Sequence, residues 1–146
     1  MAGEKIFIDT NVLVYANNTL SPLCIPARAQ LQQAFASYES VWLSRQVFRE
    51  FAVIVSREMH STGKIDFQLL GKTIRRFEKD FFVAEDNPLI TSKLLHLLEE
   101  TNSSGKQVHD TNIVATTLVH DIQTLMTHNT EDFKRFSHLI TLMPLV

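Results

Sequence analysis

The sequence predicts an α/β protein, a three-layer sandwich in which a mainly parallel central sheet lies between helices. The first observation is that short apolar segments alternate along the chain with longer segments of helical spacing. The second is that residues suited to helix starts, such as Pro26 and Ser44, stand at the beginning of those longer segments. Alternation of this kind favours strand–helix–strand units. No repeat or long linker divides the 146 residues, so we expect a single domain over residues 1–146.

Five short apolar segments are predicted as strands, because each is bounded by polar or turn-forming residues. We expect Pro144 to stop the last of them, since proline cannot donate a hydrogen bond to a neighbouring strand. The expected strands are Lys5–Ile8, Ser40–Leu43, Phe81–Val83, Thr124–Thr127 and Leu139–Leu142.

Six longer segments are predicted as helices from the spacing of their apolar residues and from their start signals. Ser44, Asp66 and Asn87 are each placed to cap the segment that follows them. The fifth helix is expected to begin at His109 or Asp110. The expected helices are residues 26–36, 45–59, 67–79, 88–100, 109–119 and 131–136.

Charge is unevenly distributed along a chain whose net charge is only −2. Residues 45–79, called the basic segment below, hold eight of the 14 lysines and arginines and four of the 16 acidic residues. This local excess of four positive charges has two explanations. The basic segment is either an ordinary solvated helix face or a weak surface for phosphate groups.

A cytoplasmic location is expected from three features of the sequence. No apolar run approaches the roughly 20 residues that a membrane-spanning helix needs, and the N-terminus has no signal-peptide pattern. Cys24 is the one cysteine, which excludes an internal disulfide and a cysteine-rich metal site. We expect Cys24 to lie in a loop without a chemical role. The sequence therefore predicts a soluble intracellular protein without a membrane partner.

Asp9 interrupts two apolar runs, Ile6–Ile8 and Val12–Tyr15, where a carboxylate is costly to bury without a partner. It stands directly after the first predicted strand. In parallel α/β sheets, ligands bind outside the carboxyl ends of the strands. Asp9 is therefore expected to project from the edge of the core into a cleft.

Three further acids occupy positions that could converge on Asp9. Glu50 borders the apolar stripe of a predicted helix, Asp110 stands at a helix start, and Asp132 follows a predicted strand. Each has an ordinary structural explanation, as a surface ion-pair partner, an N-cap or a first-turn acid respectively. Their joint placement at one edge of the sheet favours a functional site.

Four motifs resemble those of the PIN-domain nucleases, and most closely the VapC-type toxins of toxin–antitoxin systems. The resemblance covers nearly the whole chain, with the motifs in the same order and at similar spacing. They read Asp9-Thr10-Asn11, Arg49-Glu50-Phe51, Asp110-Thr-Asn-Ile-Val-Ala and Thr127-His-Asn-Thr-Glu-Asp-Phe133.

The resemblance implies that Asp9, Glu50, Asp110 and Asp132 form an acidic quartet that holds Mg²⁺ or Mn²⁺. Glu131 is the alternative fourth acid, but the acid directly before Phe133 fits the family pattern better. Hard oxygen ligands suit these cations. We also expect at least one of the four acids to be protonated or ion-paired without a cation, because crowded carboxylates repel. Beside the quartet, the resemblance implies supporting roles for Thr10, Asn11, Thr127 and Asn129.

The function implied is a metal-dependent ribonuclease that hydrolyses phosphodiester bonds in RNA, as the toxin of a toxin–antitoxin pair. Its partners would be an RNA substrate, an antitoxin protein and a second copy of the chain in a homodimer. Two alternatives stay open. The chain could be a PIN nuclease that processes RNA without an antitoxin, or a catalytically inactive PIN fold that binds other proteins.

Two other classes of α/β protein with a strand-end aspartate fit less well. A response-regulator receiver domain would need a pair of acids after the first strand and a lysine after the last, and neither is present. A phosphatase of the haloacid dehalogenase type would need a second aspartate at position 11. Asn11 stands there and cannot act as a general acid.

Overall fold

The computed structural model describes residues 3–146 and contains a five-stranded sheet whose strands all run parallel. The strand order is β3-β2-β1-β4-β5, so the first strand lies at the centre. The three-layer α/β class expected from the sequence is thereby confirmed. The strands are β1 (Lys5–Ile8), β2 (Ser40–Ser44), β3 (Phe82–Ala84), β4 (Thr124–Thr127) and β5 (Thr141–Pro144).

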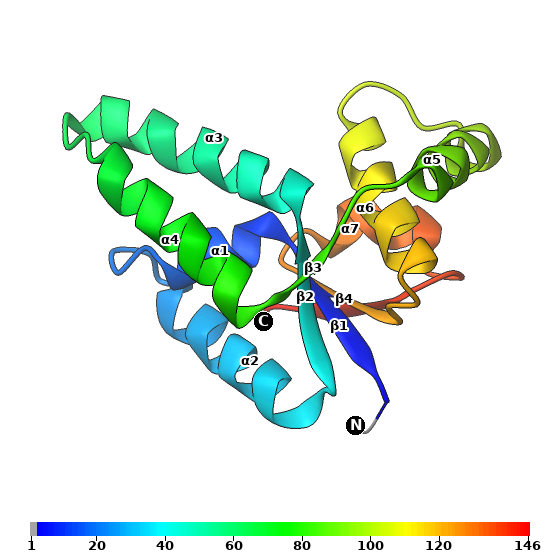
Figure 1. Cartoon of the computed structure of the whole chain (residues 1–146), viewed down its shortest axis with the longest axis horizontal. Coiled ribbons are helices and arrows are strands. Elements are labelled where there is room, and N and C mark those ends of the chain that lie inside the picture. Colours follow the sequence, from blue (N-terminus) through cyan, green and yellow to red (C-terminus); the bar gives the residue numbers. More distant parts are fainter. Residues whose placement is uncertain (1–2) are drawn as a thin grey trace.

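Helices cover both faces of the sheet (Figure 1). The first four lie on one side, where α3 and α4 form a helical arm that extends away from the sheet, and the others lie on the opposite side. They are α1 (Thr10–Ala16), α2 (Cys24–Ser37), α3 (Arg45–Thr62), α4 (Phe67–Asp80), α5 (Pro88–Thr101), α6 (Gln107–Val119) and α7 (Thr130–Phe133), followed by a 3-10 turn, η1 (Lys134–Phe136).

The sheet has one topological switch point, between β1 and β4. The chain moves from β1 outward to β3, and then crosses back to build β4 and β5 on the other side of β1. Ligand sites in open α/β sheets form outside the carboxyl ends of the strands at such a point. Asp9 follows the end of β1 and Thr127 ends β4, so both stand at this position.

The core is built around the central strand. Ile6, Phe7 and Ile8 have no exposed surface, and Leu125 and Met126 of β4 are equally buried beside them. Apolar residues at nearly every position suit a parallel strand that is covered by helices on both faces. A rigid buried strand therefore ends directly at Asp9.

Helix α1 was not predicted from the sequence, and the place expected for Cys24 was wrong. The run Val12–Tyr15 belongs to this seven-residue helix, which Asp9 begins as its N-cap. Cys24 is buried at the first turn of α2 rather than in a loop. The expectation failed because a helix this short gives too little periodic pattern to separate it from a buried strand.

Two other boundaries needed correction. Helix α6 begins at Gln107, so Asp110 lies inside the first turn and is not the N-cap. Strand β5 spans Thr141–Pro144 instead of Leu139–Leu142. Pro144 is tolerated because it is the last residue of β5, an edge strand with one neighbour only.

The helical arm carries apolar surface that the rest of the chain does not cover. A cavity of about 480 Å³ lies between α1, α3 and α4, with Val14, Phe51 and Leu70 among its lining residues. Nearby, Phe67 and Leu69 of α4 expose about half of their surface. No helix within residues 3–146 is long and apolar enough to cross a membrane.

Candidate active site

Asp9 is held in one orientation by three hydrogen bonds. The backbone N–H of Thr10 donates to Oδ1 at 2.8 Å. The hydroxyl of Thr127 donates to Oδ2 at 2.8 Å, and the side-chain amide of Asn11 donates to the same oxygen at 3.2 Å. A carboxylate accepts about four hydrogen bonds. Asp9, which is only 7% exposed, therefore keeps one acceptor position free, on Oδ1.

The residues expected to support Asp9 form a network across the switch point. The Thr127 hydroxyl also accepts from the Asn11 amide at 3.3 Å and from the backbone N–H of Asn129 at 3.1 Å. Asn11 in turn accepts from the backbone N–H of His128 at 3.0 Å. Asn129 thus contributes its backbone, and its side chain makes no capping bond to α7. Helix α1 and the loop after β4 are fixed to each other by these contacts.

Glu50 lies on α3 beside the Asp9 network. The hydroxyl of Thr10 donates to its Oε1 at 3.4 Å, and the backbone N–H of Thr10 donates to Asp9, so one residue joins the two acids. Thr10 is buried and Glu50 is half-buried. Thr10 thus links the end of β1 directly to the helical arm.

Glu50, Asp110 and Asp132 line one open cavity of about 800 Å³ between α3, α6 and α7. Asp110 is half-buried in the first turn of α6, where the helix dipole favours a negative charge, and Asp132 is exposed on α7. Glu131 is also exposed but does not line the cavity. Three of the four acids expected to form a quartet therefore border the same cavity. Asp9 does not line it, but Thr10 connects Asp9 to Glu50 by hydrogen bonds.

Burial and mutual repulsion raise the pKa values of three of these carboxyl groups. For Asp9, burial is the main cause of the raised pKa, and the charge of Asp132 raises it further. The three hydrogen bonds described above lower it, but not enough to cancel the rise. Burial, followed by the charges of Asp9 and Asp110, raises the pKa of Glu50 to about 7. Burial and the charges of Asp9 and Asp132 raise the pKa of Asp110 to about 6, although Arg135 and His109 oppose the shift. The four acids thus affect one another electrostatically.

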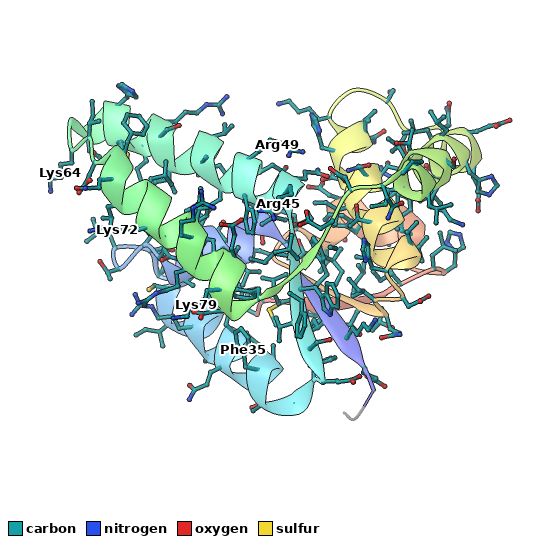
Figure 2. All side chains as sticks on the ribbon, in the orientation of Figure 1. Phe35, Arg45, Arg49, Lys64, Lys72 and Lys79 are labelled. Carbon is teal, nitrogen blue, oxygen red and sulfur yellow. The ribbon has the colours of Figure 1, made fainter. Side chains whose placement is uncertain are left out.

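The basic segment divides into two groups of side chains. Arg49 and Arg57 line the acidic cavity, and Lys106 of the loop before α6 joins them there. Arg45, in contrast, forms ion pairs with Glu78 and Glu85. Figure 2 shows Arg45 and Arg49 where α3 leaves the sheet, with Lys64, Lys72 and Lys79 along the arm. Only part of the segment therefore offers free cations to a ligand in the cavity.

The donor set fits a hard divalent cation by its chemistry. Carboxylate, hydroxyl and amide oxygens are the ligands that Mg²⁺ and Mn²⁺ prefer, and a cation would relieve the repulsion that raises the pKa values. Within residues 3–146, however, no three His, Cys, Asp or Glu side chains are grouped closely enough to hold an ion as they stand. Mg²⁺ is usually held by one or two carboxylates and keeps several waters, which suits such an open arrangement.

Two residues that line the cavity, and one whose charge acts on Asp110, were not singled out by the sequence. Gln46 and Asn112 line it and are hydrogen-bonded to each other, and Arg135 lowers the pKa of Asp110 by its charge. The guanidinium of Arg135 has two buried nitrogens, Nε and Nη2, without a hydrogen-bond partner within the described part of the chain. Gln46 had no distinctive signal in the sequence, because the face of α3 that it shares with Glu50 also carries Arg49 and Arg57.

Comparisons with known proteins identify a family and a set of similar structures. The family described as "PIN domain" matches residues 6–139, which is most of the chain. No curated protein matches the chain in sequence.

Several solved structures share the fold at low sequence identity. VapBC2 from Rickettsia felis, bound to a DNA fragment from its promoter, superposes with a TM-score of 0.71 at 19% identity, covering 96% of this chain and 98% of that one. A toxin–antitoxin complex from Klebsiella pneumoniae has a TM-score of 0.66 at 18% identity, covering 97% and 98%. VapC20 from Mycobacterium tuberculosis, a toxin that cleaves the sarcin–ricin loop, has a TM-score of 0.61 at 16% identity, covering 82% and 86%. At identities this low, the structural similarity shows a shared fold and nothing about function.

Proposed function

We propose a function for this chain from one premise: the chain belongs to the PIN domain family, whose match spans residues 6–139. The chain is a metal-dependent endoribonuclease that hydrolyses phosphodiester bonds in RNA, and it is the toxin of a toxin–antitoxin pair. One observation carries the chemistry. Glu50, Asp110 and Asp132 border a common cavity, beside a buried Asp9 that three hydrogen bonds hold in place.

Each acid has a defined part in this proposal. Asp9, Glu50, Asp110 and Asp132 hold Mg²⁺ or Mn²⁺, which supplies a water of lowered pKa and offsets negative charge on the phosphate. Asp9 offers its free Oδ1 position, since its other acceptor positions are already used.

The neighbouring polar and basic residues orient the acids and bind the substrate. Thr10, Asn11 and Thr127 fix the carboxylates of Asp9 and Glu50 by hydrogen bonds, and Asn129 adds its backbone N–H to the Thr127 hydroxyl. Cationic side chains on the cavity wall bind RNA phosphates, because neutralising phosphates is the main source of affinity for nucleic acids. These are Arg49, Arg57 and Lys106.

Asp132, and not Glu131, is the fourth acid of the proposed site. Asp132 lines the cavity with Glu50 and Asp110, whereas Glu131 does not. The charge of Asp132 also contributes to the raised pKa values of Asp9 and Asp110. We therefore expect Asp132→Asn to reduce cleavage far more than Glu131→Gln does.

The proposed partners are an antitoxin protein and a second copy of the chain. Similar folds occur in toxin–antitoxin complexes, including the VapBC proteins and the complex from Klebsiella pneumoniae. The apolar cavity between α1, α3 and α4, beside exposed Phe67 and Leu69, supports a protein partner, since large exposed apolar surface marks interaction sites. A monomer mass in light scattering at micromolar concentration would remove the homodimer from the proposal.

Cleavage of a mixed RNA pool tests the proposed activity. The purified chain is incubated with Mg²⁺ or Mn²⁺, with and without EDTA, beside the variants Asp9→Asn and Asp80→Asn. Replacing a residue that holds a metal ligand in place typically lowers activity by about 10–100-fold. We therefore expect replacement of a direct ligand, as in Asp9→Asn, to lower the cleavage rate by at least about 100-fold. Asp80→Asn is the matched control, because Asp80 is exposed at the end of α4, remote from the cavity residues.

The outcomes separate the proposed nuclease from a protein-binding module. Cleavage that disappears in EDTA and in Asp9→Asn, but persists in Asp80→Asn, supports the acidic site. No cleavage by a folded wild-type chain that binds Mn²⁺ would overturn the proposed activity and favour a PIN fold that only binds other proteins. The positions of the cuts in the pool would then begin to define the RNA substrate.

A further inference from the structure

Gln46 is a buried amide whose side chain reaches from one helix to another. It lies in the first turn of α3 and is only 8% exposed. Its Nε2 donates to the backbone carbonyl of His109 at 2.9 Å, and its Oε1 accepts from the side-chain amide of Asn112 at 2.7 Å. Both partners belong to α6. Both polar ends of the Gln46 amide are therefore used in holding α3 against α6.

The position of this contact relative to the acids is specific. Gln46 precedes Glu50 by one helical turn, so the two side chains lie on the same face of α3. On α6, His109 and Asn112 flank Asp110 in the sequence. The amide contact therefore lies beside two of the four proposed metal-binding carboxylates, one on each helix, and Gln46 itself lies close enough to Glu50 to oppose the rise in its pKa by hydrogen bonding.

Little else joins the two helices at this point. Within residues 3–146, the two side-chain hydrogen bonds between α3 and α6 both end on Gln46. Beyond Gln46, the cavity of about 800 Å³ lies between the helices, with Val53 and Ile54 on the α3 wall. Because the gap between α3 and α6 is open along most of its length, the few contacts that span it determine how far apart the two helices lie. The spacing of Glu50 and Asp110 depends on such a contact.

Only an amide of this length meets the requirements of the position. The His109 carbonyl needs a donor and the Asn112 amide needs an acceptor, so a carboxylate or an ammonium group satisfies one side only. Methionine has nearly the same volume as glutamine but offers neither. Burial of the Gln46 side chain means that water cannot readily replace the lost bonds.

We propose that Gln46 and Asn112 form a positioning clamp that sets the separation of Glu50 and Asp110, and through it the affinity of the site for a divalent cation. The clamp rests on the proposed function, because it concerns the same four acids. Gln46 and Asn112 are positioning residues and do not themselves bind the cation. Residues that hold metal ligands in place are typically worth about 10–100-fold in metal affinity.

Binding of Mn²⁺, followed by the loss of its free-ion electron paramagnetic resonance signal, tests the clamp without relying on turnover. The variants are Gln46→Met, Asn112→Ala and the two combined, with Gln68→Met as the matched control on exposed α4. We expect each single clamp variant to raise the Kd for Mn²⁺ by about 10–100-fold. The double variant should be no worse than the single ones, because residues that act as a unit are not additive.

RNA cleavage by the same variants gives a second readout that a merely structural role would not move. We expect the clamp variants to lose activity at low Mn²⁺ and to recover most of kcat when Mn²⁺ saturates the site. The circular dichroism spectrum of each variant verifies the fold. If Gln46→Met fails to fold, Asn112→Ala carries the test, because Asn112 is half-exposed and its loss leaves less buried polar surface.

The outcomes for the clamp and for the proposed function are distinct. Clamp variants that bind Mn²⁺ as tightly as the wild type and Gln68→Met would overturn the clamp and leave the nuclease proposal standing. Strictly additive losses in the double variant would also overturn it, since they would show two independent residues. A wild-type chain that neither binds Mn²⁺ nor cleaves RNA would overturn both proposals.

Discussion

Asp9 illustrates, at the scale of single residues, how a carboxylate is kept between two apolar segments. The central strand delivers it to the switch point of the sheet, and Thr10, Asn11 and Thr127 supply the donors that burial would otherwise remove. Burial nevertheless raises the pKa of this carboxyl group, and the charge of Asp132 adds to the effect. The hydrogen bonds offset only part of the cost of a buried negative charge at Asp9. A bound cation would offset the remainder.

Thr127→Val should measure how much this hydrogen bonding stabilises the fold. Valine has the shape of threonine but cannot donate to Asp9, and a hydrogen bond to a charged group is worth about 1.5–3 kcal/mol. We expect the free energy of unfolding to fall by that amount in urea at pH 8, with an unchanged m-value. Thr117→Val is the matched control, since the buried Thr117 hydroxyl donates to the neutral carbonyl of Val114. Equal losses in the two variants would contradict a special role for the Asp9 contact.

The raised pKa values of Glu50 and Asp110 predict how the stability of the metal-free protein depends on pH. Their values of about 7 and about 6 lie above the ordinary values of 4.5 and 3.8. Both groups therefore bind more protons when folded than when unfolded, and stability is lost as pH rises from the ordinary values through the raised ones. In EDTA, we expect the urea midpoint to fall between pH 5 and pH 8.

Glu50→Gln is the control for this pH dependence, because glutamine does not titrate. The variant should flatten the fall in urea midpoint, and saturating Mn²⁺ should reverse it in the wild type by stabilising the charged forms. A wild-type midpoint that rises with pH over the same range would show that burial of these acids is not what controls stability there.

At the scale of elements, the helices were more predictable than the points where they begin. Ser44, Asp66 and Asn87 cap α3, α4 and α5 as expected, because their side chains accept hydrogen bonds from the first-turn N–H groups. Helix α1 was missed because its seven residues give too little periodic pattern to separate it from a buried strand. The start of α6 was misplaced because Lys106, its actual N-cap, makes no side-chain capping bond that a sequence pattern would reveal.

The helical arm contains a buried aromatic contact between its two helices. Phe77 of α4 packs edge-on against Phe51 of α3, with ring centroids 5.1 Å apart, and both rings are buried. Removing a buried phenylalanine costs about 3–5 kcal/mol. We therefore expect Phe77→Ala to lower the free energy of unfolding by that amount.

Phe67→Ala is the matched control for this prediction, because Phe67 belongs to the same helix but is 53% exposed, and the α3 ring that it contacts, His60, is exposed as well. It should cost less than about 1 kcal/mol, as most surface substitutions do. Similar losses in the two variants, measured by urea unfolding, would mean that the arm is not held by the Phe51–Phe77 contact.

At the scale of the whole molecule, the alternation of strands and helices was sufficient to predict the layered parallel sheet. Local spacing determines which segments are strands, and few arrangements can bury them. The site was less accessible to such reasoning. Its acids stand at positions 9, 50, 110 and 132, and only the topology of the sheet brings those positions near one another. The resemblance to known motifs supplied that information for the acids, whereas the place of Gln46 and Arg135 near them is evident only from the three-dimensional structure.

The expectation of a single domain over residues 1–146 stays a prediction and is open to a direct measurement. One sheet with a shared core should unfold in a single cooperative step. Trp42 fluorescence reports on β2, and far-ultraviolet circular dichroism reports on the helices of both layers. We expect the two urea transitions to coincide, and two separate midpoints would show that the layers are independent units.

The central place of the first strand has a consequence for the order in which the protein is made. A ribosome completes Lys5–Ile8 early, yet Asp9 receives its bond from Thr127 only after most of the chain has been synthesised. At the usual 5–20 residues per second, that delay is on the order of ten seconds. Chains abandoned shortly before that point contain Asp9, Glu50 and Asp110, but they lack Asp132 and the threonine that orients Asp9. Under the proposed function, such unfinished chains would lack a complete acidic site and would not cleave the RNA of the ribosomes that produce them.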